Sequence, residues 1–182
     1  MKKQAKRAYR ITKYVVYRQT KVDVEDHFWT FVGAFLGIGL IGFVHGQAFS
    51  HLDNVFLIGS FGASSVLVYG ATNSPLAQPR NLIGGHLICA FFGVLVYKLV
   101  PDSLWFSSAL SVAISIVMMQ ITKTMHPPGG ATALIANIGS QQIKELGFLY
   151  LLSPVLSGVM ILFVIALIVN NIPKNRNYPY KG

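Results

Sequence analysis

The densest group of residues that could do chemistry is the segment 123–132, Lys-Thr-Met-His-Pro-Pro-Gly-Gly-Ala-Thr. Two consecutive prolines are excluded from a helix interior, so one helix must end near Thr124 and a short new helix can begin at Pro127 or Pro128. We expect its first amides, at 129–131, to be unpaired, and free N–H groups at a helix start attract anions. The alternative is a tight structural turn in which the histidine caps neighbouring carbonyls. The candidate binding residues of this segment are Lys123, Thr124, His126, Pro127, Pro128, Gly129, Gly130 and Thr132.

A second polar group, Ser-Pro-Leu-Ala-Gln-Pro-Arg-Asn at 74–81, precedes an apolar stretch. Arg80 can present a fork of donors to a planar oxyanion, and Gln78 and Asn81 can add neutral donors. Equally, Arg80 can simply mark the cytoplasmic side of a loop. His86 follows inside the apolar stretch, where a titratable group is a candidate for ligand contact or proton relay.

A third group combines small and hydroxyl-bearing residues: Ser60, Gly62, Ser64 and Ser65. On one helix they would form a small polar surface that can line a pore, although close helix packing in lipid favours the same residue types. No spacing among the five histidines resembles a zinc motif, and Cys89 is the only cysteine. The sequence therefore predicts neither a metal site nor another cofactor.

The composition indicates the surroundings in which these groups act. Of the 182 residues, 53% are hydrophobic and 12% are charged, whereas soluble domains carry about 25% charged residues. The formal net charge of +9 would suggest a nucleic-acid partner in a soluble chain. Yet residues 1–26 hold eight basic and three acidic residues, 172–182 hold three basic ones, and 27–171 are nearly balanced. The sequence therefore predicts a membrane protein with basic ends and no nucleic-acid partner.

Four apolar stretches are long enough to be transmembrane helices, since a bilayer core about 30 Å thick needs about 20 helical residues. They are 28–49, 82–100, 104–122 and 148–169. The basic ends place both termini in the cytoplasm, so the number of crossings is even and the expected location is the cell (inner) membrane. We expect 172–182 to be a basic cytoplasmic tail. Residues 1–26 would be a basic cytoplasmic segment, either an amphipathic helix on anionic lipid or a solvated topology signal.

Two further apolar stretches, 55–71 and 128–138, are too short for ordinary spans and predict re-entrant or half helices. The motif Gly-Ala-Ser-Ser-Val at 62–66 in the first stretch parallels Gly-Ala-Thr-Ala-Leu at 130–134 in the second. This likeness, with the same order of elements around each motif, indicates an internal repeat.

The expected fold class is an all-α polytopic membrane domain over residues 27–171. Four long transmembrane helices and two short ones would form two units, about 28–100 and 104–169, each consisting of a long helix, a short helix and a long helix. If each short helix completes a crossing, the units are inverted relative to each other, a recurring plan for transporters. If each returns on the same side, the units are parallel.

The motif His-Pro-Pro-Gly-Gly-Ala-Thr-Ala-Leu at 126–134, preceded by 62–67 and 74–81, resembles the HPP family of integral membrane proteins, named for that His-Pro-Pro. The resemblance covers roughly residues 27–170. It implies four membrane spans and transport of a small anion. Nitrite is the leading substrate, because family members in photosynthetic organisms are associated with nitrite transport.

Residues and resemblance together predict a secondary transporter or channel for nitrite or a similar oxyanion, and not an enzyme. The anion would bind between two short helix N-termini near the membrane midplane, and protonation of His126 or His86 could couple its movement to protons. Two other classes stay open: a membrane enzyme that uses His126 as a base, and a scaffold that anchors a partner through the basic N-terminus. The expected partners are a small inorganic anion, the lipid bilayer and a second copy of the chain.

Overall fold

The elements of the computed structural model, which describes residues 23–100 and 102–180, are all helical. The α-helices are α2 (Val24–Gly46), α3 (His51–Gly70), α4 (Pro79–Leu99), α5 (Leu104–Thr122), α6 (Gly129–Ile138), α7 (Gln141–Leu146) and α8 (Ser157–Val169). Three short pieces of other helix types join them: the 3-10 turns η1 (Pro75–Ala77) and η2 (Gly147–Leu151), and the π-type piece η3 (Leu152–Leu156). The all-α fold class is confirmed for the described part of the chain.

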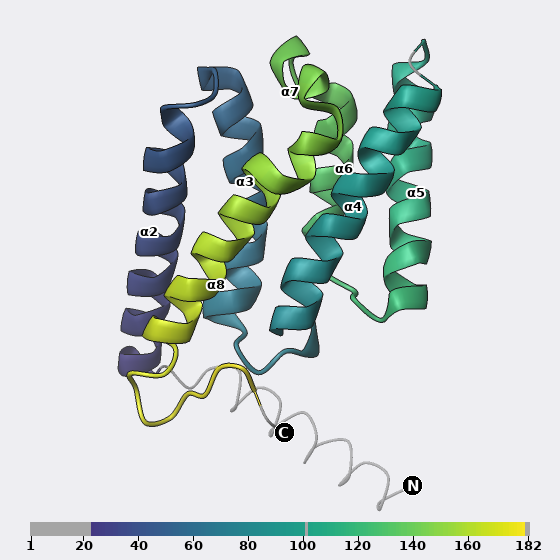
Figure 1. Cartoon of the computed structure of the whole chain (residues 1–182). Helices are drawn as coiled ribbons and strands as arrows, with labels where there is room; N and C mark the ends of the chain where they lie inside the picture. The colour runs from purple at the N-terminus through teal and green to yellow at the C-terminus, as the bar shows by residue number, and fades with distance from the viewer. Residues whose placement is uncertain (1–22, 101, 181–182) are drawn as a thin grey trace, which may run out of the picture.

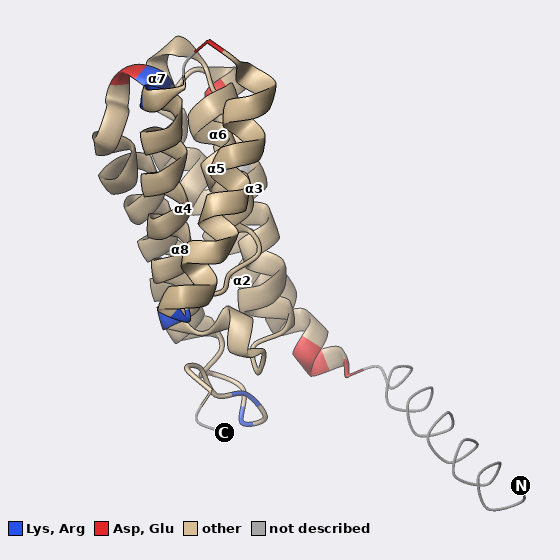
Figure 2. Ribbon diagram, turned by 90° about the vertical axis from the view of Figure 1, so that its right-hand side faces the viewer, with Lys and Arg blue, Asp and Glu red and all other residues tan. Residues whose placement is uncertain are grey.

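The helices run alternately up and down in one bundle (Figure 1). The start of α2 and the end of α8 lie together at one end, named here the terminal end, and α7 lies at the opposite, far end. In the part of the chain that the structure describes, the positions of Lys, Arg, Asp and Glu lie toward these two ends, and the middle of the bundle carries none (Figure 2). Among the described residues, five helices, counting 141–169 as one, are long and apolar enough to cross a membrane. The prediction of a multi-pass integral membrane protein is therefore confirmed.

The first short helix differs from the prediction. Except for its last residue, the stretch 55–71 lies in α3, which has 20 residues and is long and apolar enough to span. The predicted stretch left out the polar start of α3, because a carboxylate such as that of Asp53 is unfavourable in a membrane unless it is paired. Asp53 is fully buried, and its carboxylate accepts hydrogen bonds from Ser50 Oγ (2.9 Å) and the Ser140 N–H (3.1 Å). The prediction of a half helix here is wrong.

The second short helix is present, since α6 has only 10 residues. At 1.5 Å per residue it is about 15 Å long, half of a bilayer core. The chain reaches it from the end of α5 by the segment 123–128, which belongs to neither helix. Two glycines let α6 pack closely on α4: a Cβ at Gly93 would lie 2.7 Å from the Ala133 carbonyl oxygen, and one at Gly129 would lie 2.8 Å from Cys89 Sγ.

The final span changes helix type along its length instead of forming one helix over 148–169. Ser153 has φ −136° and ψ 124°, which is not helical, and it precedes Pro154, which has no backbone donor. Regular α-helix resumes only at Ser157. The directions of the elements match the inverted alternative, because α2, α3 and α4 alternate oppositely to α5, α6 and α8 (Figure 1). A symmetry relation between the two units stays a prediction.

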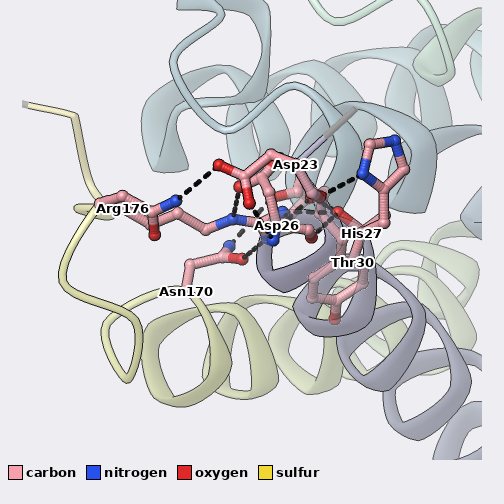
Figure 3. Close-up of polar contacts among 9 residues, drawn as sticks. Asp23, Asp26, His27, Thr30, Asn170 and Arg176 are labelled. Carbon is pink, nitrogen blue, oxygen red and sulfur yellow. Dashed lines mark hydrogen bonds and ion pairs between the residues drawn. The ribbon is translucent and has the colours of Figure 1, made fainter. Parts of the chain in front are cut away.

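Residues 170–180 fold back over the terminal end and are named here the C-terminal strap. Arg176 pairs with Asp26 of α2 and donates to Thr30 Oγ1 (2.6 Å) and the Tyr69 carbonyl (3.2 Å) (Figure 3). The phenol of Tyr178, which is 2% exposed, donates to the carbonyl of Ala77 at 2.8 Å. The predicted basic tail is therefore packed against α2, α3 and the turn before α4. The predicted N-terminal amphipathic helix falls mostly on residues 1–22, which lie outside the described residues.

Candidate functional site

Five of the candidate residues meet in one buried group, named here the histidine cluster: Ser60, Ser64, His86, His126 and Thr132. Each is at most 2% exposed. Two come from α3, one from α4, one from the segment before α6, and one from the first turn of α6. The two helices that carry the repeat-like motifs, α3 and α6, therefore meet in the bundle interior, where Ser60 Oγ lies 2.8 Å from Thr132 Oγ1.

Ser64 joins the two histidines. Its Oγ lies 2.7 Å from His86 Nε2 and 2.9 Å from His126 Nε2, and the ring centroids are 5.0 Å apart. On the other side of His86, Nδ1 lies 2.7 Å from Thr132 Oγ1, which lies 2.8 Å from Ser60 Oγ. One unbroken series of hydrogen bonds therefore runs from Ser60 to His126.

The series ends at the backbone on both sides. His126 Nδ1 lies 2.9 Å from the carbonyl oxygen of Leu76, in η1. At the other end, Ser60 Oγ lies 3.4 Å from the carbonyl oxygen of Pro128. Both terminal groups can only accept hydrogen bonds, so they constrain where the protons of the cluster lie.

Local sequence features explain how these side chains meet. Ser60 and Ser64 are four residues apart and so share one face of α3. Lys123 ends α5 in the left-handed conformation, with φ 56° and ψ 41°, and redirects the chain. Gly85 then admits His126 against α4, because a Cβ there would lie 2.5 Å from His126 Cβ.

The start of α6 differs from the prediction. The N–H groups of residues 129, 130 and 131 donate to the carbonyls of His126 (2.9 Å), Pro127 (3.0 Å) and Pro128 (3.1 Å). The prediction of unpaired amides is wrong, because the backbone already turns helically before α6, and Pro128 has φ −59° and ψ −23°. Side chains, and not free amides, supply the polar groups of this site.

Three candidates from the second polar group hold loops in place. Arg80 Nη2 donates to the Thr122 carbonyl (2.7 Å), and Asn81 Nδ2 donates to the Met125 carbonyl (2.7 Å). The amide of Gln78 donates to two carbonyls of the loop before α4, at 2.8 and 2.9 Å. These bonds tie the start of α4 to the end of α5 and to the segment that carries the histidine.

The other candidates take no part in the hydrogen bonds of the histidine cluster: Gly62, Ser65, Lys123, Thr124, Pro127, Gly129 and Gly130. A Cβ at Gly62 would meet nothing within 4 Å, and Ser65 Oγ donates to the Phe61 carbonyl of its own helix (3.0 Å). Thr124 Oγ1 lies 2.8 Å from Thr122 Oγ1, and Lys123 is exposed at the terminal end.

Sequence reasoning missed two groups that form hydrogen bonds to the histidine cluster, the Leu76 carbonyl and the Tyr150 hydroxyl. The carbonyl of Leu76 carries no signal in the sequence, since any residue type supplies one. Tyr150 is fully buried and donates from its hydroxyl to the Thr132 carbonyl at 3.1 Å. A tyrosine inside an apolar span was a usable signal, because a buried hydroxyl needs a partner. Within the residues that the structure describes, no three His, Cys, Asp or Glu side chains converge as metal ligands.

Comparison with known proteins agrees with this architecture. The family profile described as "HPP, transmembrane region" matches residues 19–179. One transmembrane protein of Dictyostelium discoideum is 42% identical over 164 residues, covering 87% of this chain and 52% of the relative. Another from the same organism is 44% identical over 160 residues, covering 86% and 56%. The chain spans about half the length of these curated relatives, and no solved structure matches it. With the profile matching nearly its whole length, the chain belongs to the HPP family of transmembrane proteins.

Proposed function

We propose that this chain is a membrane transporter or channel for a small oxyanion, with nitrite as the leading candidate. The observation that carries the proposal is the histidine cluster, a set of five polar side chains buried inside an apolar helix bundle. Polar and titratable groups are expensive at membrane depth, and they mark substrate or ion pathways. The family resemblance supplies the choice of nitrite.

The chemistry of the cluster suits a weakly held anion. Its members are hydroxyls and imidazoles, and none of their hydrogen bonds among the described residues involves Lys, Arg, Asp or Glu. Neutral donors can bind an ion that must also leave, whereas a buried unpaired cation would hold it too long. Thr132 lies in the first turn of α6, so the positive end of that helix dipole adds favourable potential for an anion.

The terminal end would be the cytoplasmic mouth in the cell membrane. Arg80 and Lys123 are both exposed there and would attract an anion toward the cluster. The eight basic residues of the first 21 favour the same side, although they lie outside the described residues. At the far end lie two basic residues, Lys98 and Lys144, and three acidic ones, Asp53, Asp102 and Glu145.

Uptake of nitrite into proteoliposomes tests the proposal. We expect flux above that of protein-free vesicles, and we expect His126→Gln to lower it by roughly tenfold or more. Ser107→Ala is the matched control, because the hydroxyl of this buried serine of α5 donates, among the described residues, only to the Leu104 carbonyl of its own helix (3.3 Å). A wild-type protein that carries no nitrite, nitrate or formate, with or without a proton gradient, would refute the function.

One contact favours a second candidate, a membrane enzyme. Ser64 Oγ, His126 and the Leu76 carbonyl stand in the order of nucleophile, base and orienting acceptor found in serine hydrolases. A fluorophosphonate probe separates the two candidates. Labelling of the wild type that disappears in Ser64→Ala would favour the enzyme, and unlabelled protein that carries nitrite would favour the transporter.

A further inference from the structure

We infer that the histidine cluster binds a single proton and passes it between His86 and His126 through the hydroxyl of Ser64. Where the proposed function holds, on which this part rests, each monovalent oxyanion would cross the membrane together with one proton. The proton-binding part stands on the geometry of the cluster alone.

The Leu76 carbonyl sets the positions of the protons. A carbonyl only accepts, so the hydrogen of a neutral His126 lies on Nδ1, and Nε2 is an acceptor. The contact of 2.9 Å between Ser64 Oγ and that Nε2 is then a hydrogen bond only if Ser64 donates its one proton to it, and the alternative acceptor, the Ser60 carbonyl, is farther away at 3.3 Å. The same Ser64 oxygen therefore accepts from His86 Nε2–H, at 2.7 Å. The two neutral rings are opposite tautomers, and no other arrangement keeps both contacts.

The other half of the series follows in the same way. With its hydrogen on Nε2, His86 accepts at Nδ1 from the hydroxyl of Thr132, at 2.7 Å. Thr132 in turn accepts from Ser60, at 2.8 Å. Every hydrogen bond points from Ser60 toward Leu76, and the Pro128 carbonyl near Ser60 is left as a spare acceptor.

The spare acceptor allows one extra proton without loss of any contact. When the proton is on His86, Nδ1–H donates to Thr132, Thr132 to Ser60, and Ser60 to the Pro128 carbonyl. When it is on His126, Nε2–H donates to Ser64, and Ser64 donates to His86. Both protonated forms keep each link of the series occupied by one hydrogen.

A single concerted step connects the two protonated forms. The His86 Nε2–H bond breaks and its proton bonds to Ser64 Oγ, while the Ser64 O–H bond breaks and its proton bonds to His126 Nε2. One positive charge moves from one ring to the other, and the serine ends as a neutral hydroxyl. Without that hydroxyl the rings, whose centroids are 5.0 Å apart, have no proton path between them through this series.

The surroundings favour one charge and disfavour two. A second proton would put a positive charge on both rings, and like charges this close in a low dielectric repel strongly. The neighbouring side chains and backbone are uncharged: Phe61 of α3 lies against His86, the Leu76 carbonyl of η1 against His126, and Tyr150 of η2 against the Thr132 backbone. Met119 of α5 lies beside Gly85 and Cys89 of α4 beside Gly129. One proton in the cluster offsets the charge of one nitrite ion.

Nitrogen-15 NMR of the histidine rings tests the protonation pattern directly, with His86→Gln and His126→Gln used for assignment. At neutral pH we expect His126 in the Nδ1–H form and His86 in the Nε2–H form. On acidification the two rings should share the first proton. Two rings in the same tautomer, or two independent protonations, would overturn the inference.

Proteoliposomes that contain a pH-sensitive dye test the coupling, with nitrite as the probe and with potassium and valinomycin setting the membrane voltage to zero and to other fixed values. We expect about one proton per nitrite above the leak of protein-free vesicles, and a rate that does not change with voltage. Ser64→Ala should abolish proton movement, Ser64→Thr should restore it, and Ser107→Ala should leave it unchanged. Nitrite flux without proton flux would overturn the proton relay and leave the proposed transport function standing. Absence of nitrite flux refutes the transport function, and the NMR measurement still decides the relay.

Discussion

The hydroxyl of Tyr178 donates to the carbonyl of Ala77 at 2.8 Å, and the carbonyl one residue earlier, at Leu76, accepts from His126. The C-terminal strap and the histidine cluster are therefore hydrogen-bonded to adjacent carbonyls of the same turn. Tyr180 adds a second tie to the same turn, because its N–H donates to Gln78 Oε1 at 2.8 Å. The strap holds the turn whose carbonyl orients the histidine.

Removal of the Tyr178 hydroxyl should destabilise the protein. Tyr178→Phe leaves the buried Ala77 carbonyl without its donor, which costs about 1–3 kcal/mol. Thermal unfolding in detergent measures the loss, and Tyr180→Phe is the control because Tyr180 is 48% exposed. Equal stability of Tyr178→Phe and the wild type would mean that the strap does not hold the turn.

The same contact predicts a pH dependence. Burial raises the pKa of Tyr178 above its ordinary value of 10, so the phenol is a neutral donor at physiological pH. A raised pKa means that the stabilisation is fully present below pH 10 and is lost as the pH rises further. The stability difference between wild type and Tyr178→Phe should therefore be constant from about pH 6 to 9 and shrink above about pH 10. A difference that disappears already near neutral pH would contradict this.

Arg176 should be the most sensitive residue of the strap. Its side chain is 4% exposed and is paired with Asp26, so Arg176→Gln would leave the carboxylate and several acceptors unpaired. Breaking a buried pair costs about 3–5 kcal/mol, reduced here because Asp26 is 41% exposed. Limited proteolysis of the C-terminus and thermal unfolding measure the effect. Lys174→Gln, at an exposed position of the same segment, should have almost none.

The contact between Gly85 and His126 predicts a strong effect of one methyl group. Gly85→Ala would place a Cβ 2.5 Å from His126 Cβ and 2.9 Å from the Thr124 carbonyl oxygen. Such overpacking costs about 1–3 kcal/mol and would displace the ring from Ser64, so nitrite uptake should fall while the protein still inserts. In Gly59→Ala the new Cβ meets nothing within 4 Å, and uptake should persist. Normal uptake by Gly85→Ala would argue against a role for the position of this ring.

Arg80 should affect uptake through its charge. At low ionic strength, Arg80→Gln should slow nitrite uptake by roughly tenfold, because a mouth cation raises the local anion concentration. In high salt the difference should vanish by screening. Arg80→Lys loses the guanidinium group that donates to the Thr122 carbonyl, but it keeps the positive charge. Because the charge is what attracts the anion, Arg80→Lys should retain the fast rate. A defect that is independent of salt would assign Arg80 to loop structure alone.

Several parts of the fold were predictable because membrane insertion depends on local composition. Stretches such as 104–122 are uncharged for long enough to span, and the two prolines at 127 and 128 require a break before α6. Asp53 shows the limit of this reasoning. Its charge made the start of α3 look unsuitable for a membrane, whereas Ser140, far along the chain, supplies the hydrogen bonds that allow its burial.

The sequence by itself determined that this chain is a multi-pass helical membrane protein of the HPP family, and it singled out His126, His86 and Ser64. Only the tertiary structure decided that these three side chains form one hydrogen-bonded series and that Arg80 and Asn81 tie loops together. It also decided that the amides at the start of α6 are paired. The physical reason is that span length and helix breaks follow from neighbouring residues. A buried hydrogen bond instead needs partners that packing brings from distant segments.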